Sequence, residues 1–169
     1  LSAMLLARAI GARTVMVDVV AEKLSHASAH GADAVVNAAD TDPVAAIRDI
    51  TGGGAHVAVE ALGIETTTAN ALKCLRKLGR MVQIGMPAGP HTQMTLPMDA
   101  VYSGQLALFG TRGMPAWRYP SLLGLIEAGR VDLSPLIARR VTLSEASREL
   151  AAFDHPAPPG VAVITDFRR

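Results

Sequence analysis

TVMVDVVAEK, residues 14–23, is the stretch of sequence that decides the fold. Within it an apolar run ends on the carboxylate of Asp18, and Glu22 and Lys23 then open a helix-like segment. In dinucleotide-binding folds the second strand ends on an acid that hydrogen-bonds the hydroxyls of the adenosine ribose. The pattern therefore predicts a strand followed by a helix, with Asp18 as a candidate ribose ligand. A solvated acid or a helix N-cap would look the same in sequence.

Short apolar runs and helix-like segments continue to alternate along the chain. Asp42 followed by Pro43 predicts one helix start, because proline lacks only an N–H that would have no intrahelical partner there. Short strands alternating with helices indicate a parallel sheet with helices on both faces, so we predict an α/β, doubly wound fold. The first helix carries Arg8 as its only charge and is expected to be buried on every side. The expected strands are 14–18, 34–36, 56–60, 80–84 and 106–110, and the expected helices are 1–10, 21–30, a segment from 43, and 66–77.

The rhythm changes after Gly113. Thr142 and Glu145 have the spacing of a capping box, in which each residue satisfies a backbone N–H of the other. We expect this part to be an α+β segment of a second domain, so the predicted division is 1–113 and 114–169. Its expected elements are a helix over 120–128, a helix after the capping box, a proline-rich turn over 156–159 and a strand over 161–165.

Composition excludes several classes of function. The 169 residues carry a formal net charge of +1, which predicts no nucleic-acid or acidic-membrane partner. The single cysteine, Cys74, allows neither an internal disulfide nor a multi-cysteine zinc site, and the histidines lack metal-ligand spacing, so we expect no metal site in this chain. No apolar run reaches the roughly 18 residues of a membrane span, and no signal peptide is evident, so a cytoplasmic protein is expected.

Three expected strand ends carry further candidate ligand residues. In open α/β sheets ligands bind beyond the carboxyl ends of the strands, and glycine there lets the backbone approach a ligand closely. Turn formation explains any one of these glycines, whereas three at one sheet edge indicate a ligand site. The Gly52–Gly54 run precedes a strand, which is the wrong order for a phosphate loop at a helix N-terminus. The three strand ends are Ala61-Leu62-Gly63, Ile84-Gly85-Met86 and Thr111-Arg112-Gly113.

Over essentially its whole length the sequence resembles the zinc-dependent medium-chain alcohol dehydrogenase family. Asp18 followed five residues later by Lys23 is one feature of the resemblance, and the others are the segments 1–12, 53–63, 78–85 and 110–115. In that family a first strand and a glycine-rich phosphate loop precede a segment like 1–12. The resemblance implies an incomplete Rossmann domain over 1–113, and a portion of the GroES-like catalytic domain over 114–169. Because the first residue is Leu1, we expect a fragment or a processed product.

The resemblance also implies roles for individual residues. Asp18 and Lys23 hold the adenosine ribose, and the carboxylate of Asp18 favours NAD because it repels the 2′-phosphate of NADP. The implied reaction is hydride transfer between an alcohol and an aldehyde or ketone, with zinc in the intact protein and neither zinc ligands nor catalytic residues in this chain. A homodimer or homotetramer through the edge strand 106–110 is implied as well. The implied cofactor contacts are Val19 and Leu62 at the adenine, with Ala61 and Gly63 in the same loop, and Ile84, Gly85, Met86, Thr111 and Arg112 at the nicotinamide carboxamide.

Three other interpretations stay open. A zinc-free quinone or enoyl reductase of the same superfamily usually has a basic or small residue where Asp18 stands. A methyltransferase also holds a ribose with an acid after its second strand, but it needs an antiparallel last strand. A non-catalytic nucleotide-binding module is the third possibility.

The strand order of the family predicts a gap in the sheet. In the order 3-2-1-4-5-6, the strands that end at Asp18 and Glu60 both pair with strand 1. Without that strand they stand two strand spacings apart, roughly 9.6 Å, which no hydrogen bond can cross. We therefore expect this polypeptide, expressed alone, to be poorly stable or to aggregate through two unpaired strand edges.

Overall fold

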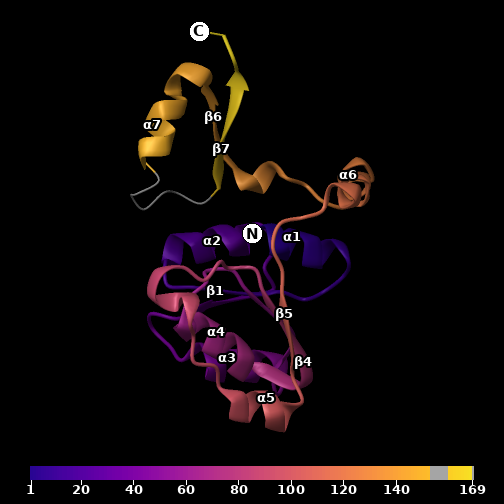
Figure 1. Cartoon of the computed structure of the whole chain (residues 1–169). Coiled ribbons are helices and arrows are strands. Elements are labelled where there is room, and N and C mark those ends of the chain that lie inside the picture. Colours follow the sequence, from indigo (N-terminus) through magenta and orange to yellow (C-terminus); the bar gives the residue numbers. More distant parts are fainter. Residues whose placement is uncertain (153–159, 169) are drawn as a thin grey trace. The chain divides into compact units, whose positions relative to one another are not determined.

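The computed structural model describes residues 1–152 and 160–168, so the expected proline-rich turn at 156–159 lies outside the described residues. The chain forms two compact units. The first unit comprises Leu1–Val35 and Trp117–Arg169, and the second unit comprises Val36–Ala116 (Figure 1). Each unit consists of short strands and helices, as expected for an α/β protein.

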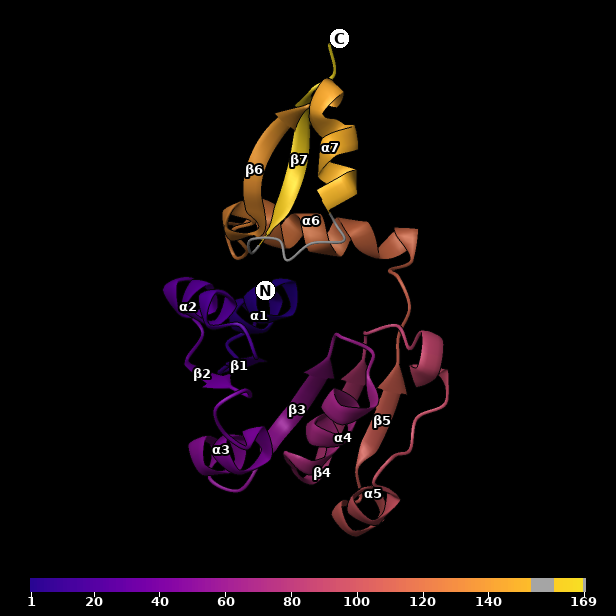
Figure 2. The same ribbon diagram turned by 90° about the vertical axis from the view of Figure 1, so that its left-hand side faces the viewer.

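The second unit contains a three-stranded parallel sheet in the order β3-β4-β5. Figure 2 shows the three strands running in the same direction, with α4 lying across one face. Glu60 pairs with Gln83, and Gln83 pairs with Gly110, so the three strands end at the same level. The elements are α3 (Pro43–Thr51), β3 (Ala55–Glu60), α4 (Glu65–Lys73), β4 (Leu75–Gln83), η1 (Gly89–Thr92), α5 (Met98–Gly104) and β5 (Ala107–Gly110).

Helix α3 begins where its sequence predicts. The side chain of Asp42 accepts a hydrogen bond from the backbone N–H of Val44 at 2.9 Å, and Pro43 occupies the first turn. The helix ends at Gly52, whose φ of 64° is left-handed and therefore suits glycine. The predicted start is confirmed.

Helix α4 is shorter than the predicted 66–77, because the chain enters β4 at Leu75. Leu75 pairs with Ala55 of β3, and the next pair is Val57 with Arg80, so the residues between Leu75 and Arg80 bulge out of the ladder. The three-residue spacing of Leu72 and Leu75 predicts one buried helix face. Both residues are buried, but Leu75 belongs to a strand, so the prediction was wrong here.

The core of the second unit is a small apolar cluster. Leu72, Leu75 and Met81 are buried, with partly buried Ala58 and Val101 packed against them. Full burial of one such large side chain contributes about 1.5–3 kcal/mol. This cluster holds α4 against the sheet and thereby fixes the loop that joins β3 to α4.

The first unit contains two small sheets, β1-β2 and β6-β7. Strand β2 lies at the division between the units, and β6 and β7 pair in parallel. The expected strand 161–165 and helix 120–128 are present with bounds shifted by a residue or so. The elements are α1 (Ser2–Ala9), β1 (Val15–Asp18), α2 (Ala21–Ala29), β2 (Ala34–Asn37), η2 (Ala116–Arg118), α6 (Tyr119–Glu127), η3 (Ser134–Leu136), β6 (Ile137–Thr142), η4 (Leu143–Glu145), α7 (Ala146–Ala151) and β7 (Val161–Asp166).

Strands β1 and β3 belong to separate sheets, as expected from the family strand order. On β3, Val57 and Val59 are 52% and 44% exposed. Strands of parallel sheets are normally buried on both faces. The exposed valines therefore mark an incompletely covered strand.

Helix α1 is not buried on every side. Met4 and Ala9 are buried, whereas Leu6 and Ile10 are exposed. The guanidinium of Arg130 donates to the carbonyl oxygen of Ala9 at 2.8 Å. The helix therefore packs through one face only, and the prediction from its composition was wrong.

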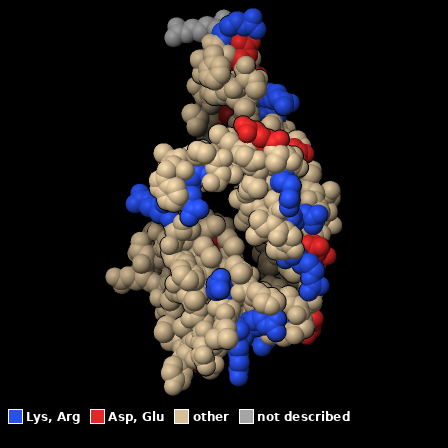
Figure 3. All heavy atoms as spheres, turned by 90° about the vertical axis from the view of Figure 1, so that its right-hand side faces the viewer, with Lys and Arg blue, Asp and Glu red and all other residues tan. Residues whose placement is uncertain are grey.

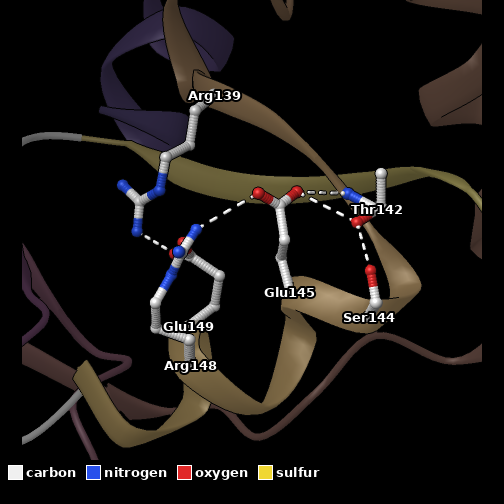
Figure 4. A network of polar contacts seen from close by, with 6 residues as sticks. All are labelled: Arg139, Thr142, Ser144, Glu145, Arg148 and Glu149. Atoms are coloured by element: carbon white, nitrogen blue, oxygen red, sulfur yellow. Dashed lines mark hydrogen bonds and ion pairs between the residues drawn. The ribbon is translucent and has the colours of Figure 1, made fainter.

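The predicted capping box is present between β6 and α7, and Figure 4 shows it within a larger polar network. The carboxylate of Glu145 accepts from the backbone N–H of Thr142 at 2.9 Å and from its hydroxyl at 3.0 Å. The backbone N–H is the main reason why the pKa of Glu145 lies below its usual value. Arg148 pairs with the same carboxylate at 3.2 Å, and Arg139 pairs with Glu149.

Charged side chains are dispersed on one face of the molecule. On the face drawn in Figure 3, basic and acidic residues lie in several separate groups with uncharged residues between them. Among the described residues, no helix has both the length and the apolar character needed to cross a membrane.

Candidate functional site

Asp18 lies at the end of β1 and its carboxylate is held by the backbone that follows. Its Oδ1 accepts from the N–H groups of Val19 and Val20, at 2.8 and 3.0 Å. Val20 is the N-cap of α2 and makes no side-chain capping bond, so the interpretation of Asp18 as a helix cap is wrong. The local backbone instead fixes the direction of the carboxylate.

The second oxygen of Asp18 faces a cation. Its Oδ2 lies 3.9 Å from Nζ of Lys23, and both side chains are partly exposed. A carboxylate can accept about four hydrogen bonds, so the two local bonds leave capacity for ligand hydroxyls. Lys23 adds a donor beside them, and the side chain of Val19 is exposed next to the pair. This arrangement suits the two hydroxyls of a ribose.

In the second unit, two of the predicted strand-end loops are in direct backbone contact. A Cβ added to Gly63 would lie 2.3 Å from the carbonyl oxygen of Met86, and one added to Gly85 would lie 2.3 Å from the backbone nitrogen of Gly63. Gly63 also has a φ of 86°. The loops 61–63 and 84–86 therefore meet at a point where only glycine fits.

Glu60, which was not among the predicted site residues, joins these two loops. Its side chain is buried, and its Oε1 accepts from the N–H groups of Leu62 and Gly63 at 2.8 and 3.0 Å. Its other oxygen accepts from the side-chain amide of Gln83. The sequence did contain a signal for Glu60, because β3 ends on this acid just as β1 ends on the acid Asp18.

The third predicted strand end lies beside the second. The N–H of Thr111 donates to the carbonyl oxygen of Gln83 at 3.1 Å, which extends the ladder between β4 and β5 by one bond. Arg112 follows and is exposed. The apolar side chains of Leu62, Ile84 and Met86 are 63%, 50% and 74% exposed. The carboxyl edge of this sheet thus presents exposed apolar side chains.

The predicted site residues fall into two groups. Asp18, Val19 and Lys23 belong to the first unit, while those of the three strand-end loops belong to the second unit.

The described residues contain no cluster of three or more His, Cys, Asp or Glu side chains that could hold a metal ion. The histidine pair on α2 has structural roles, because His26 hydrogen-bonds the carbonyl oxygen of Pro135 at 3.0 Å and His30 bonds that of His26 at 2.7 Å. Cys74 is buried, and burial raises the pKa of its thiol to about 11.

A hollow of about 350 Å³ in the second unit lies near the amino-terminal end of β3. It is lined by His56, Val57 and the residues from Arg76 to Arg80. Ligands of open α/β sheets bind at the carboxyl ends of the strands, so we assign the candidate site to the loops and not to this hollow.

Comparison with known proteins gives the family. The family described as zinc-binding dehydrogenase matches residues 1–128. L-idonate 5-dehydrogenase of Vitis vinifera is 32% identical over 97% of this chain and 45% of its own length. An alcohol dehydrogenase of Cupriavidus necator is 31% identical over 88% of this chain and 40% of its own length. The chain thus spans less than half the length of these relatives.

Solved structures agree in fold. Benzyl alcohol dehydrogenase from Acinetobacter calcoaceticus superimposes with a TM-score of 0.84 at 27% identity, covering 97% of this chain and 46% of that one. An alcohol dehydrogenase zinc-binding domain protein from Burkholderia ambifaria gives 0.81 at 29% identity, covering 90% and 42%. The expected resemblance is confirmed. Because the family match extends over 128 of the 169 residues, the chain belongs to the zinc-binding dehydrogenase family.

Proposed function

We propose that this chain is the cofactor-binding part of an NAD-dependent alcohol dehydrogenase, which transfers hydride between an alcohol and an aldehyde or ketone. The observation that carries the proposal is Asp18, whose carboxylate is directed by two backbone N–H groups and flanked by Lys23. The relatives named above act on L-idonate and on an alcohol, as their names state. The proposed substrate is accordingly a small alcohol or carbonyl compound.

NAD is the proposed cofactor because of the charge at Asp18. A 2′-phosphate placed where the ribose hydroxyls bind would face this carboxylate and be repelled. In the proposed binding mode Val19 and Leu62 contact the adenine, with Ala61 and Gly63 supporting that loop. Ile84, Gly85, Met86, Thr111 and Arg112 meet the nicotinamide carboxamide.

Zinc belongs to the family, but no group of described residues fits the metal. We propose that the zinc ligands of the enzyme lie outside the described residues, and we assign no catalytic residue among those that the structure describes. We further propose that residues 1–113 form the nucleotide-binding domain and 114–169 a portion of the catalytic domain.

The zinc-free reductase and the non-catalytic module are not favoured. The chain matches the zinc-binding dehydrogenase family, and the relatives named above are an L-idonate 5-dehydrogenase and an alcohol dehydrogenase. An acid at position 18 also disfavours the NADPH that zinc-free reductases usually take.

The test of the cofactor is Asp18→Ala in the enzyme that carries this chain. The ratio of kcat/KM for NAD to that for NADP is expected to fall by about tenfold or more, because one tenfold step corresponds to about 1.4 kcal/mol, within reach of a lost charged hydrogen bond. Asp49→Ala, an exposed acid on α3, is the matched control and leaves the ratio unchanged. An unchanged ratio in Asp18→Ala would show that Asp18 is not the ribose ligand.

We also propose a homodimer or homotetramer that forms through β5. This strand lies at the edge of its sheet, and Leu108 and Phe109 on it are 44% and 51% exposed. An exposed apolar edge strand is a template for pairing with another chain. Light scattering on Phe109→Lys is expected to give a smaller assembly than the parent, and an unchanged mass would exclude this edge.

A further inference from the structure

We propose that Glu60 is a positioning residue that, together with Gln83, couples the two cofactor loops, so that adenine-side loop 61–63 and nicotinamide-side loop 84–86 take up their binding positions as one body. This inference rests on the proposed function. It concerns how the site is built and assigns Glu60 no contact with substrate or cofactor.

The first argument is the environment of the carboxylate. Glu60 is 3% exposed, and none of the ion pairs among residues 1–152 and 160–168 includes it. Its side chain accepts hydrogen bonds from the N–H groups of Leu62 and Gly63, from the hydroxyl of Thr67 at 2.7 Å and from the amide of Gln83. Burying a carboxylate without hydrogen-bond donors costs a large free energy, so the fold is expected to keep these donors in place around Glu60.

The second argument is that these donors come from both loops. The carbonyl oxygen of Glu60 accepts from the N–H groups of Ile84 and Gly85, at 2.8 and 3.0 Å, while its side chain accepts from those of Leu62 and Gly63. One residue thus fixes the start of each loop. The loops also meet directly at Gly63 and Gly85, so a shift of one displaces the other.

Gln83 completes the link and sets the direction of its own amide. Its Nε2 donates to Glu60 and also to the carbonyl oxygen of Gly85 at 2.9 Å. Turning the amide over would set its oxygen against the carbonyl oxygen of Gly85, and both of these atoms only accept hydrogen bonds. Position 60 therefore has to offer an acceptor.

Both oxygens of the Glu60 side chain accept hydrogen bonds, which a carboxylate can do and an amide cannot. An ionised carboxylate only accepts hydrogen bonds, whereas an amide has one oxygen and an NH₂ group that donates. In Glu60→Gln one donor would face either Gln83 or the backbone N–H of Gly63. The double variant Glu60→Gln/Gln83→Glu exchanges donor and acceptor and restores that contact, although it loses the bond to Gly85.

The experiment measures cofactor binding by calorimetry in the enzyme that carries this chain. The probes are NAD and ADP-ribose, which contains the adenosine half without nicotinamide. Glu60→Gln is expected to raise the Kd of NAD about tenfold and that of ADP-ribose roughly threefold, since both loops move. The double variant recovers part of the loss for both probes. The KM of the alcohol is expected to stay within about twofold, because Glu60 is not placed near it.

The control is Glu65→Gln, another carboxylate at the start of α4, which accepts from the N–H of Thr95 at 3.0 Å. It should leave both Kd values unchanged, and urea midpoints check that every variant is folded at the assay temperature. If the wild type binds NAD and Glu60→Gln binds it with the same Kd, the inference about Glu60 is overturned and the proposed function stands. A loss confined to NAD, with ADP-ribose unaffected, overturns the coupling. Failure of the wild type to bind NAD overturns the proposed function instead.

Discussion

Gly85→Ala is the most direct test of the contact between the two loops. The new Cβ would lie 2.3 Å from the backbone nitrogen of Gly63 and 2.6 Å from both the backbone nitrogen of Leu62 and Oε2 of Glu60. These neighbours are backbone atoms and a buried carboxylate, none of which can rotate away. The loops must therefore separate to admit one methyl group.

The expected loss of stability has two parts. Overpacking a tight site costs about 1–3 kcal/mol. Separating the loops also weakens the bonds from Leu62 and Gly63 to Glu60, and each buried group left without its partner costs about 1–3 kcal/mol. We expect a total of about 3–5 kcal/mol, a large share of the ~5–15 kcal/mol that stabilises a typical domain.

Urea denaturation followed by circular dichroism measures this loss, and Gly110→Ala supplies the control. Gly110 ends β5 at the same level of the sheet, and a Cβ there would meet no atom within 4 Å. Gly110→Ala should change the free energy of unfolding by no more than about 0.5 kcal/mol. If Gly85→Ala and Gly110→Ala differ by less than about 1 kcal/mol, the loops are not in the close contact described here.

Three further outcomes can be measured. The N–H of Thr14 donates to the carboxylate of Asp33 at 2.7 Å and lowers its pKa. The ionised carboxylate therefore stabilises the fold above about pH 4, and this contribution is lost as the pH falls through the lowered pKa. The urea midpoints of wild type and Asp33→Asn should accordingly converge in acid and differ near neutrality. Cys74 is buried with a pKa of about 11, so iodoacetamide at about pH 8 should leave it unmodified in the folded chain and alkylate it in urea. Asp42→Ala removes the cap on Val44 and should cost about 1 kcal/mol, whereas an unchanged unfolding free energy would show that the cap contributes nothing.

The sequence alone determined the order of most elements, because their signals are local. Asp42 with Pro43 gave the start of α3, and the spacing of Thr142 and Glu145 gave the capping box. These features depend on hydrogen bonds between residues two or three positions apart, so nearby letters suffice to predict them. Asp18 was found in the same way, as an acid at the end of an apolar run.

The tertiary structure alone decided how α4 ends, how α1 is covered and what Glu60 does. In the sequence, Leu75 is compatible with a buried position in a helix or in a strand. Only its pairing with Ala55 shows that it belongs to a strand. The partners of Glu60 include Gln83, 23 residues away in sequence, and the contact between Gly63 and Gly85 spans a similar distance. Periodicity and spacing describe which residues share a face of one element. They do not describe which elements meet, because that depends on side-chain packing and hydrogen bonds between segments far apart in the chain.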